Sequence, residues 1–479
     1  MEDRTRWLAL FVLCAGTLMI VLDTTIVNVA LPSIREDLGF DESTLAWVVN
    51  AYAITFAGFL LLGGRLGDLY GQRRLFLGGI TLFTFASLAC GLSFSQGSLI
   101  VARAAQGLGG AVASAVALSL IMGLFPEPEA RAKAMGVFGF VASGGGAIGV
   151  LLGGVITSAL DWHWVFLVNI PVGVGVVIAS LALLSPARGV AVGQRLDVAG
   201  AVLVTSALIV GVYAIVNGNQ AGWSSPRTLG LLGLAAILLV AFLVLESRVA
   251  HPLMPLDLFR SRNVATANAV GVLWSAAMFA WFFLSALYLQ LVLLYDPLQV
   301  GLSFLGANLL MAAFSLGLSA RIVLRFGVRV PLAVGMLLVA IGLALFARAP
   351  VDGVFLVDVL PSMLLLGLGA GIAFNPVLLA SMSDVPPERS GLASGVANTS
   401  FMMGGALGLA ILASLAAART HALAGPGEPS RAALAAGYHA AFVAGALFAL
   451  LASALAAALL RDEGIPKDGD PHAQATLDL

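Results

Sequence analysis

Long apolar stretches alternate with short polar segments along most of the chain. Each stretch approaches or exceeds the roughly 20 residues that a helix needs to cross the hydrocarbon core of a membrane. The stretches are continuous rather than alternating in polarity, which favours helices over the strands of a membrane barrel. The pattern predicts fourteen membrane helices, over residues 8–31, 45–63, 75–95, 98–124, 133–158, 164–184, 197–217, 228–247, 264–292, 299–320, 331–348, 354–380, 391–415 and 438–460.

The composition agrees with an all-α membrane protein. Of the 479 residues, 60% are hydrophobic and only 10% are charged, with a mean hydropathy of +1.02. A soluble chain carries roughly 45–50% apolar and about 25% charged residues. A soluble enzyme is therefore excluded, and the net charge of −1 gives no indication of a nucleic-acid partner.

Basic residues gather on one set of helix ends. Eighteen Lys and Arg residues lie at the ends that share a side with both termini, and five lie at the opposite ends. Because cytoplasmic loops carry the excess of Lys and Arg, both termini are predicted in the cytoplasm. The loop at 219–227 is then predicted outside, and the number of spans is predicted to be even.

Four short patterns recur in the same order in the two halves of the chain. Internal repeats of this kind are typical of transporters. They predict six helices, two inserted helices and six further helices, with domains at 1–185, 186–262 and 263–461 and a disordered tail at 462–479. The matching segments are 64–73 with 320–329, 107–110 with 367–370, 129–131 with 388–389, and 145–146 with 404–405.

Asp23 is the only carboxylate well inside a predicted span. A charge at this depth costs at least about 2.5–3.5 kcal/mol, so it usually faces a cavity or a partner and indicates function. The alternative is a structural carboxylate that a neighbouring helix holds in place. Polar side chains of the first helix form a stripe near Asp23, and the candidate substrate-cavity residues are Thr17, Thr24, Asn28, Asn50 and Gln106.

Arg103 is the only guanidinium well inside a predicted span. Arg103 and Asp23 both fall in the outer half of the membrane, with a height difference of roughly 6 Å at 1.5 Å per residue. A pair between them would change the affinity of Asp23 for protons as a cavity opens and closes. The alternative is that Arg103 extends to the outer headgroups.

Two further segments are candidates for conformational change. The predicted cytoplasmic loop at 64–74 combines an acid, arginines and glycines, and the fifth predicted helix has glycines at a spacing of four, which permits close helix packing. The gating-loop candidates are Gly64, Asp68, Gly71, Arg73 and Arg74. The pivot candidates are Gly145, Gly149, Gly153 and Gly154.

The sequence gives no support to an enzyme or a cofactor protein. It has no GxSxG, HExxH or phosphate-binding GxxxxGK motif, and its five histidines are scattered. The two cysteines, Cys14 and Cys90, build no disulfide framework or metal cluster. No cofactor and no metal are expected.

Several of these segments together resemble motifs of the fourteen-span drug:proton antiporters of the major facilitator superfamily. The resemblance extends to about residue 460 and is carried by Leu22–Pro32, Gly64–Arg74, Arg103–Ala111, Gly145–Gly154 and Trp164–Gly173. The third of these matches the family pattern RxxQGxGxA. The fourth is similar to GxxxGPxxGG but has Val150 in place of the proline.

The resemblance implies two six-helix bundles around a cavity in a bacterial plasma membrane, and export of small lipophilic compounds driven by proton influx. It implies that Asp23 carries the proton with the help of Arg103, that the loop latches a cytoplasmic gate, and that the glycines form a pivot. The chain is expected to act as a monomer. A transporter-like sensor, a lipid-handling protein and a solute importer or symporter are the alternatives.

Overall fold

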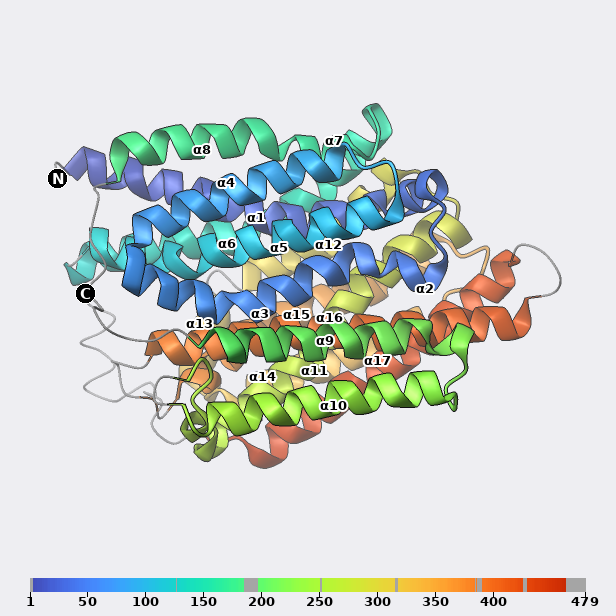
Figure 1. Cartoon of the computed structure of the whole chain (residues 1–479). Helices are drawn as coiled ribbons and strands as arrows, with labels where there is room; N and C mark the ends of the chain where they lie inside the picture. The colour runs from blue at the N-terminus through green and yellow to red at the C-terminus, as the bar shows by residue number, and fades with distance from the viewer. Residues whose placement is uncertain are drawn as a thin grey trace. The chain divides into compact units, whose positions relative to one another are not determined.

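The computed structural model describes residues 3–125, 127–184, 197–249, 252–314, 318–383, 385, 390–424 and 429–461. Within these ranges the chain is helical and contains no strand (Figure 1). The tail predicted at 462–479 and residues 186–196, which begin the second predicted domain, lie outside the described residues.

Contacts divide the chain into two units. Unit 1 comprises Met1–Phe40, Trp47–Val210 and Gly233–Pro255, and unit 2 comprises Asp41–Ala46, Gly211–Leu232 and Leu256–Leu479. The first helices along the chain are α1 (Asp3–Leu38), α2 (Glu42–Leu45), α3 (Trp47–Tyr70), α4 (Gln72–Gly91), α5 (Gln96–Leu124), α6 (Pro128–Ala159), α7 (Trp164–Leu167), α8 (Asn169–Leu183), α9 (Val198–Ala221) and α10 (Pro226–Glu246). The later helices are α11 (Arg262–Leu287), α12 (Pro297–Ala313), α13 (Ser319–Phe326), α14 (Arg329–Phe346), α15 (Leu360–Met382), α16 (Ser390–Leu423) and α17 (Arg431–Leu459).

Each of the fourteen predicted apolar stretches coincides with a helix. In the described residues, eleven helices are long and apolar enough to cross a membrane, and Trp47–Leu60, Ile148–Ala159 and Pro297–Ala313 form shorter apolar helices. The sixth stretch is divided, because α7 ends at Leu167 and α8 begins at Asn169. The all-helical membrane fold is confirmed, and the number of crossings stays a prediction.

The helix boundaries have local causes in the sequence. Ser95 begins α5 with a reciprocal cap, in which its side chain accepts the Ser98 N–H and the Ser98 side chain accepts the Ser95 N–H. Asp296 and Gln299 form the same arrangement at the start of α12, where Pro297 occupies the first helical turn. These caps satisfy backbone donors that have no partner within the helix.

Equivalent glycines make the turns in the two units. Gly71 lies between α3 and α4 with a φ of 95°, and Gly327 lies between α13 and α14 with a φ of 74°. Residues with a side chain rarely adopt this conformation. The two positions are 256 residues apart, which is the offset that the sequence repeat predicts.

The repeat also appears in the helix packing. In unit 1, a Cβ on Gly79 of α4 would lie 2.8 Å from the carbonyl oxygen of Gly109 in α5. In unit 2, a Cβ on Gly335 of α14 would lie 2.8 Å from the carbonyl oxygen of Gly369 in α15. The backbones of both helix pairs are therefore in direct contact at equivalent positions, and Figure 1 shows α4 and α5 side by side in unit 1.

Candidate functional site

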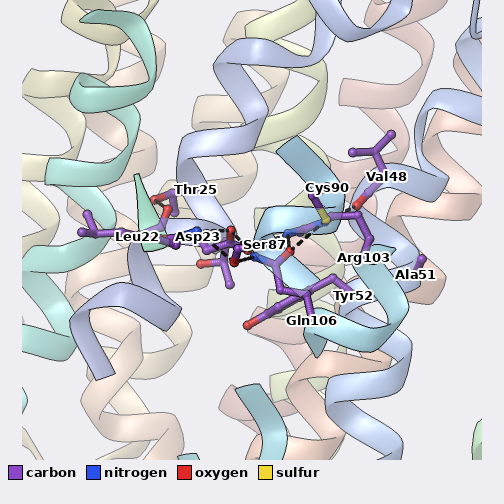
Figure 2. Close-up of polar contacts among 12 residues, drawn as sticks. Leu22, Asp23, Thr25, Val48, Ala51, Tyr52, Ser87, Cys90, Arg103 and Gln106 are labelled. Carbon is purple, nitrogen blue, oxygen red and sulfur yellow. Dashed lines mark hydrogen bonds and ion pairs between the residues drawn. The ribbon is translucent and has the colours of Figure 1, made fainter. Parts of the chain in front are cut away.

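An ion pair is buried among the helices of unit 1. Arg103 in α5 donates from Nη1 to Oδ2 of Asp23 in α1, with a nitrogen–oxygen distance of 2.5 Å. The exposed fraction is 0% for Asp23 and 1% for Arg103. Figure 2 shows the two side chains directed toward each other. The structure thus brings together the one carboxylate and the one guanidinium that the sequence places deep within spans.

The second carboxylate oxygen of Asp23 has partners of its own. Oδ1 accepts a hydrogen bond from Nε2 of Gln106 at 2.7 Å and another from Nδ2 of Asn169 at 3.0 Å. Gln106 also donates to the hydroxyl of Ser87 at 2.8 Å. Three donors therefore converge on one carboxylate, one of them the guanidinium of Arg103.

Arg103 is held in place on several sides. Its Nε donates to the carbonyl oxygen of Val48 at 2.9 Å, and Nη1 also donates to Oε1 of Gln106 at 2.6 Å. The guanidinium lies over the rings of Tyr52 and Phe166, at 4.6 and 5.6 Å from their centroids. The alternative in which Arg103 extends to the headgroups is not observed, because its side chain is buried and bound to Asp23.

The other predicted cavity residues lie outside this network. Thr17 and Thr24 donate to carbonyl oxygens of their own helix, those of Leu13 and Val21. Asn28 donates to carbonyls within α1 as well. Asn50 is fully buried, and its side-chain amide has no hydrogen-bond partner among the described residues. Gln106, which the sequence predicts as a cavity residue, bonds directly to Asp23, and the cavity role of all five residues stays a prediction.

The predicted gating loop lies where α3 ends and α4 begins. Arg73 donates from Nη2 to the carbonyl oxygen of Leu181 in α8 at 2.8 Å, whereas Arg74 is exposed. Gly64 lies within α3, and Gly71 makes the turn. The side chain of Asp68 lies outside the described residues, so the proposed role of Asp68 stays a prediction.

The glycines of the predicted pivot lie in α6 and face α1. A Cβ on Gly145 would lie 2.9 Å from a side-chain carbon of Val21, and a Cβ on Gly153 would lie 2.6 Å from the carbonyl oxygen of Ile26. A Cβ on Gly149 would lie 2.9 Å from the carbonyl oxygen of Leu22. The neighbouring Gly154 is buried. Close packing of α6 therefore occurs directly beside Asp23.

Five side chains of the network were not predicted as site residues. Ser87, Cys90 and Asn169 hydrogen-bond within the network, and Tyr52 and Phe166 place their rings against Arg103. Asn169 and Phe166 belong to the Trp164–Gly173 motif, which supports the family resemblance but does not indicate a role for either residue. Uncharged polar and aromatic residues are too common in spans for Ser87 and Tyr52 to stand out.

Matching glycine contacts relate α1 to α11. A Cβ on Gly149 in α6 meets Leu22 of α1, and a Cβ on Gly408 in α16 meets Ala276 of α11. Leu22 and Ala276 are 254 residues apart. The same offset places Ala277 at the position of Asp23.

Unit 2 has apolar residues at the positions equivalent to the network. With the 260-residue offset of the α5 and α15 motifs, Met363 corresponds to Arg103 and Leu366 to Gln106. Ala277, Met363 and Leu366 are all buried. The two units thus share glycine contacts, while only unit 1 has a buried ion pair at this position.

The fold and the site together define a class of protein. Internal repeats of membrane helices and a buried ion pair within spans are features of secondary transporters. The chain belongs to the Major Facilitator Superfamily, whose family model matches residues 13–409.

Several curated bacterial proteins are similar to the chain over most of its length. A puromycin resistance protein of Streptomyces alboniger is 39% identical over 88% of this chain and 84% of its own. A cephamycin export protein of Amycolatopsis lactamdurans is 38% identical over 95% of this chain and 92% of its own. A tetracenomycin C resistance and export protein of Streptomyces glaucescens is 34% identical over 86% of this chain and 76% of its own.

Two substitutions of Arg103 are expected to reduce transport to different extents. Arg103→Ala removes every hydrogen bond to the guanidinium and leaves Asp23 without a counter-ion, at a cost of about 3–5 kcal/mol in stability, and transport is expected to be lost. Arg103→Lys retains the charge but loses the Nε bond to Val48, so partial transport is expected. The exposed Arg348→Lys serves as the control. Full transport by purified Arg103→Ala would contradict this role.

Proposed function

We propose that this protein exports small lipophilic compounds from bacterial cells in exchange for protons, by alternating access. The buried Asp23–Arg103 network is the observation that carries the proposal, because it places one titratable acid among helices that are packed closely enough to transmit a change. The names of the similar proteins refer to resistance against antibiotics or to their export, which supports a substrate of that kind.

Protonation would act on this network through Arg103. The ionised carboxylate accepts from Arg103, Gln106 and Asn169 together. A proton on Asp23 neutralises the acceptor and occupies one of its oxygens, which leaves the buried guanidinium without a counter-ion. Leaving one charge of a buried pair alone is strongly unfavourable, at about 3–5 kcal/mol. A rearrangement of α1 relative to α5 relieves this cost, and proton binding is thereby coupled to a change of conformation.

The test is transport by the purified protein in liposomes under an imposed pH gradient. A fluorescent lipophilic substrate is expected to move against the direction of proton flow, and an uncoupler is expected to abolish that movement. Movement in the same direction as the protons would instead identify a symporter. Absence of movement with every compound of a chemically varied panel would favour the sensor or lipid-handling alternative.

The positive charge that a substrate can carry is expected to be limited by the number of acidic residues within the membrane spans. Of the acidic residues in the described helices, only Asp23 lies well inside a span. A second positive charge would be left without an anion in a low-dielectric environment, which is costly. We therefore expect stronger resistance to a monoquaternary compound than to its matched bis-quaternary analogue in an efflux-deficient host. Stronger protection against the bis-quaternary compound would overturn this expectation.

The proposed topology makes its own prediction. With fourteen spans and both termini in the cytoplasm, the turn between α9 and α10 lies outside. Ser224→Cys is expected to react with an impermeant maleimide in intact cells, and Ser247→Cys only after permeabilisation, since both serines are exposed at opposite ends of α10. The native Cys14 and Cys90 are buried and give little background. The reverse labelling pattern would contradict the topology.

A further inference from the structure

Two carboxylates meet at one end of the α9–α10 hairpin. Asp197 directly precedes α9, and Glu246 is the last residue of α10. Both belong to unit 1. Their exposed fractions are only 7% and 3%, so more than nine-tenths of each side chain is buried. Acidic side chains are rarely buried to this extent unless they are paired.

Each carboxylate has one oxygen with a backbone partner. Oδ1 of Asp197 accepts the N–H of Gly200 at 2.8 Å, and Oε2 of Glu246 accepts the N–H of Met254 at 2.8 Å. The other two oxygens, Oδ2 of Asp197 and Oε1 of Glu246, are buried and have no hydrogen-bond donor among the described residues. Within the described part of the chain, neither carboxylate forms an ion pair with a Lys, Arg or His.

The two oxygens without partners face each other. A Cβ on Gly200 would lie 2.5 Å from Oδ2 of Asp197 and 2.7 Å from Oε1 of Glu246, so both atoms border the same point in space. Because glycine has no side chain, this point stays empty, whereas the Cβ of any other residue would occupy it. Glycine at this position therefore permits the two carboxylates to approach each other.

Among the described residues, an apolar cluster adjoins the pair. Ala201, next to Gly200, and Leu253, next to Met254, pack together with Leu62 of α3 in one buried cluster. Phe59 and Leu66 of the same helix lie against this cluster. Such a setting weakens solvation of charge, so two adjacent ionised carboxylates here would repel each other and each would be poorly solvated.

A single proton shared by the two carboxylates would remove both the repulsion between them and the second poorly solvated charge. We propose that Asp197 and Glu246 hold a single proton between Oδ2 and Oε1, which makes them a second proton-binding site in unit 1. One carboxyl group donates this proton as a hydrogen bond, the other accepts it, and the pair then carries one negative charge that two backbone N–H groups stabilise. The bond joins the start of α9 to the end of α10 and, through Met254, to the segment that follows. In the part of the chain that the structure describes, the site shares no hydrogen-bond partner with Asp23, and it does not depend on the proposed transport function.

The test uses infrared difference spectroscopy on the purified full-length protein at neutral pH. The wild type is expected to show a deuterium-sensitive C=O band of a protonated carboxyl group that Asp197→Asn and Glu246→Gln each lose. The exposed Asp352→Asn is the control and is expected to retain the band. Retention of the band in both single amide variants would overturn the proposal.

The melting temperatures of the variants provide a second, independent test. An amide at either position donates one N–H in place of the shared proton, so Asp197→Asn and Glu246→Gln are expected to keep the melting temperature of the wild type. Asp197→Ala leaves Glu246 without a donor and is expected to lower it by several degrees. Failure of Asp197→Asn to fold would overturn the proposal, because the amide supplies the missing donor.

A divalent cation is the competing occupant of this site. Melting temperatures are therefore compared with added Mg²⁺ or Ca²⁺ and with a chelator. The shared proton predicts no difference between these conditions. A cation-dependent stabilisation of the wild type that Asp197→Asn abolishes would overturn the proposal in favour of a metal site.

Discussion

Asp23→Asn is expected to abolish proton-driven export while substrate binding persists. The amide has nearly the shape of the carboxylate but does not titrate, so the network loses its proton-dependent change. Because the carboxylate is also the only counter-ion of Arg103 that the described residues provide, the substitution leaves a buried charge unpaired. We expect a loss of about 3–5 kcal/mol in stability and a fall in proton-coupled transport of about 100-fold or more, the scale of a positioned proton-transfer group.

A double variant separates these two effects. Unit 2 has Ala277 and Met363 at the positions of Asp23 and Arg103, so its backbone tolerates an apolar pair there. Asp23→Asn combined with Arg103→Met removes the unpaired charge and is expected to recover the melting temperature without recovering transport. Transport at the wild-type rate by Asp23→Asn in a pH-gradient liposome assay would show that Asp23 is not the proton carrier.

Gly149→Leu is expected to block export through packing alone. A Cβ at this position would lie only 2.9 Å from the backbone oxygen of Leu22 and closer still to the hydroxyl of Thr25. A leucine side chain therefore holds α6 away from α1 at the residue before Asp23. We expect near-complete loss of transport, with the protein still folded in the membrane, because the rest of the α1–α6 contact remains.

The control for this variant lies in α8. Gly175 has open space around the position of its Cβ and is exposed, so Gly175→Leu adds the same side chain without a clash. Expression, monodispersity and transport are compared between the two variants. Normal transport by Gly149→Leu, or equal loss in both variants, would remove the argument from close packing.

The helices and the ion pair could be predicted from the sequence for the same reason. Placing an apolar span or a charge inside a membrane changes the free energy greatly, so each is recognisable in the sequence alone. Asp23 and Arg103 stand out as charged residues within apolar stretches, and only the ion pair between them had to be learned from the structure. The glycine spacing in α6 likewise predicted a close contact, which the structure places against α1.

The remaining partners of the site could not be predicted in this way. Ser87 and Asn169 are ordinary residues for a membrane helix, and their importance arises only from the direction in which each helix faces. The polar stripe of α1 lies outside the network, and its role in a substrate cavity stays a prediction. Hydroxyl groups such as those of Thr17 and Thr24 are satisfied by carbonyls one turn earlier, so their presence alone did not define the network.

The apolar residues that replace the network in unit 2 have an evolutionary consequence. The glycine contacts recur in both units, because a side chain at these positions would separate two backbones. The buried charges were under no such constraint, since an aliphatic trio such as Ala277, Met363 and Leu366 fills equivalent positions. On the proposed function, only unit 1 carries buried charges at this position for coupling to protons, so the equivalent residues of unit 2 can change without disturbing the use of the proton gradient.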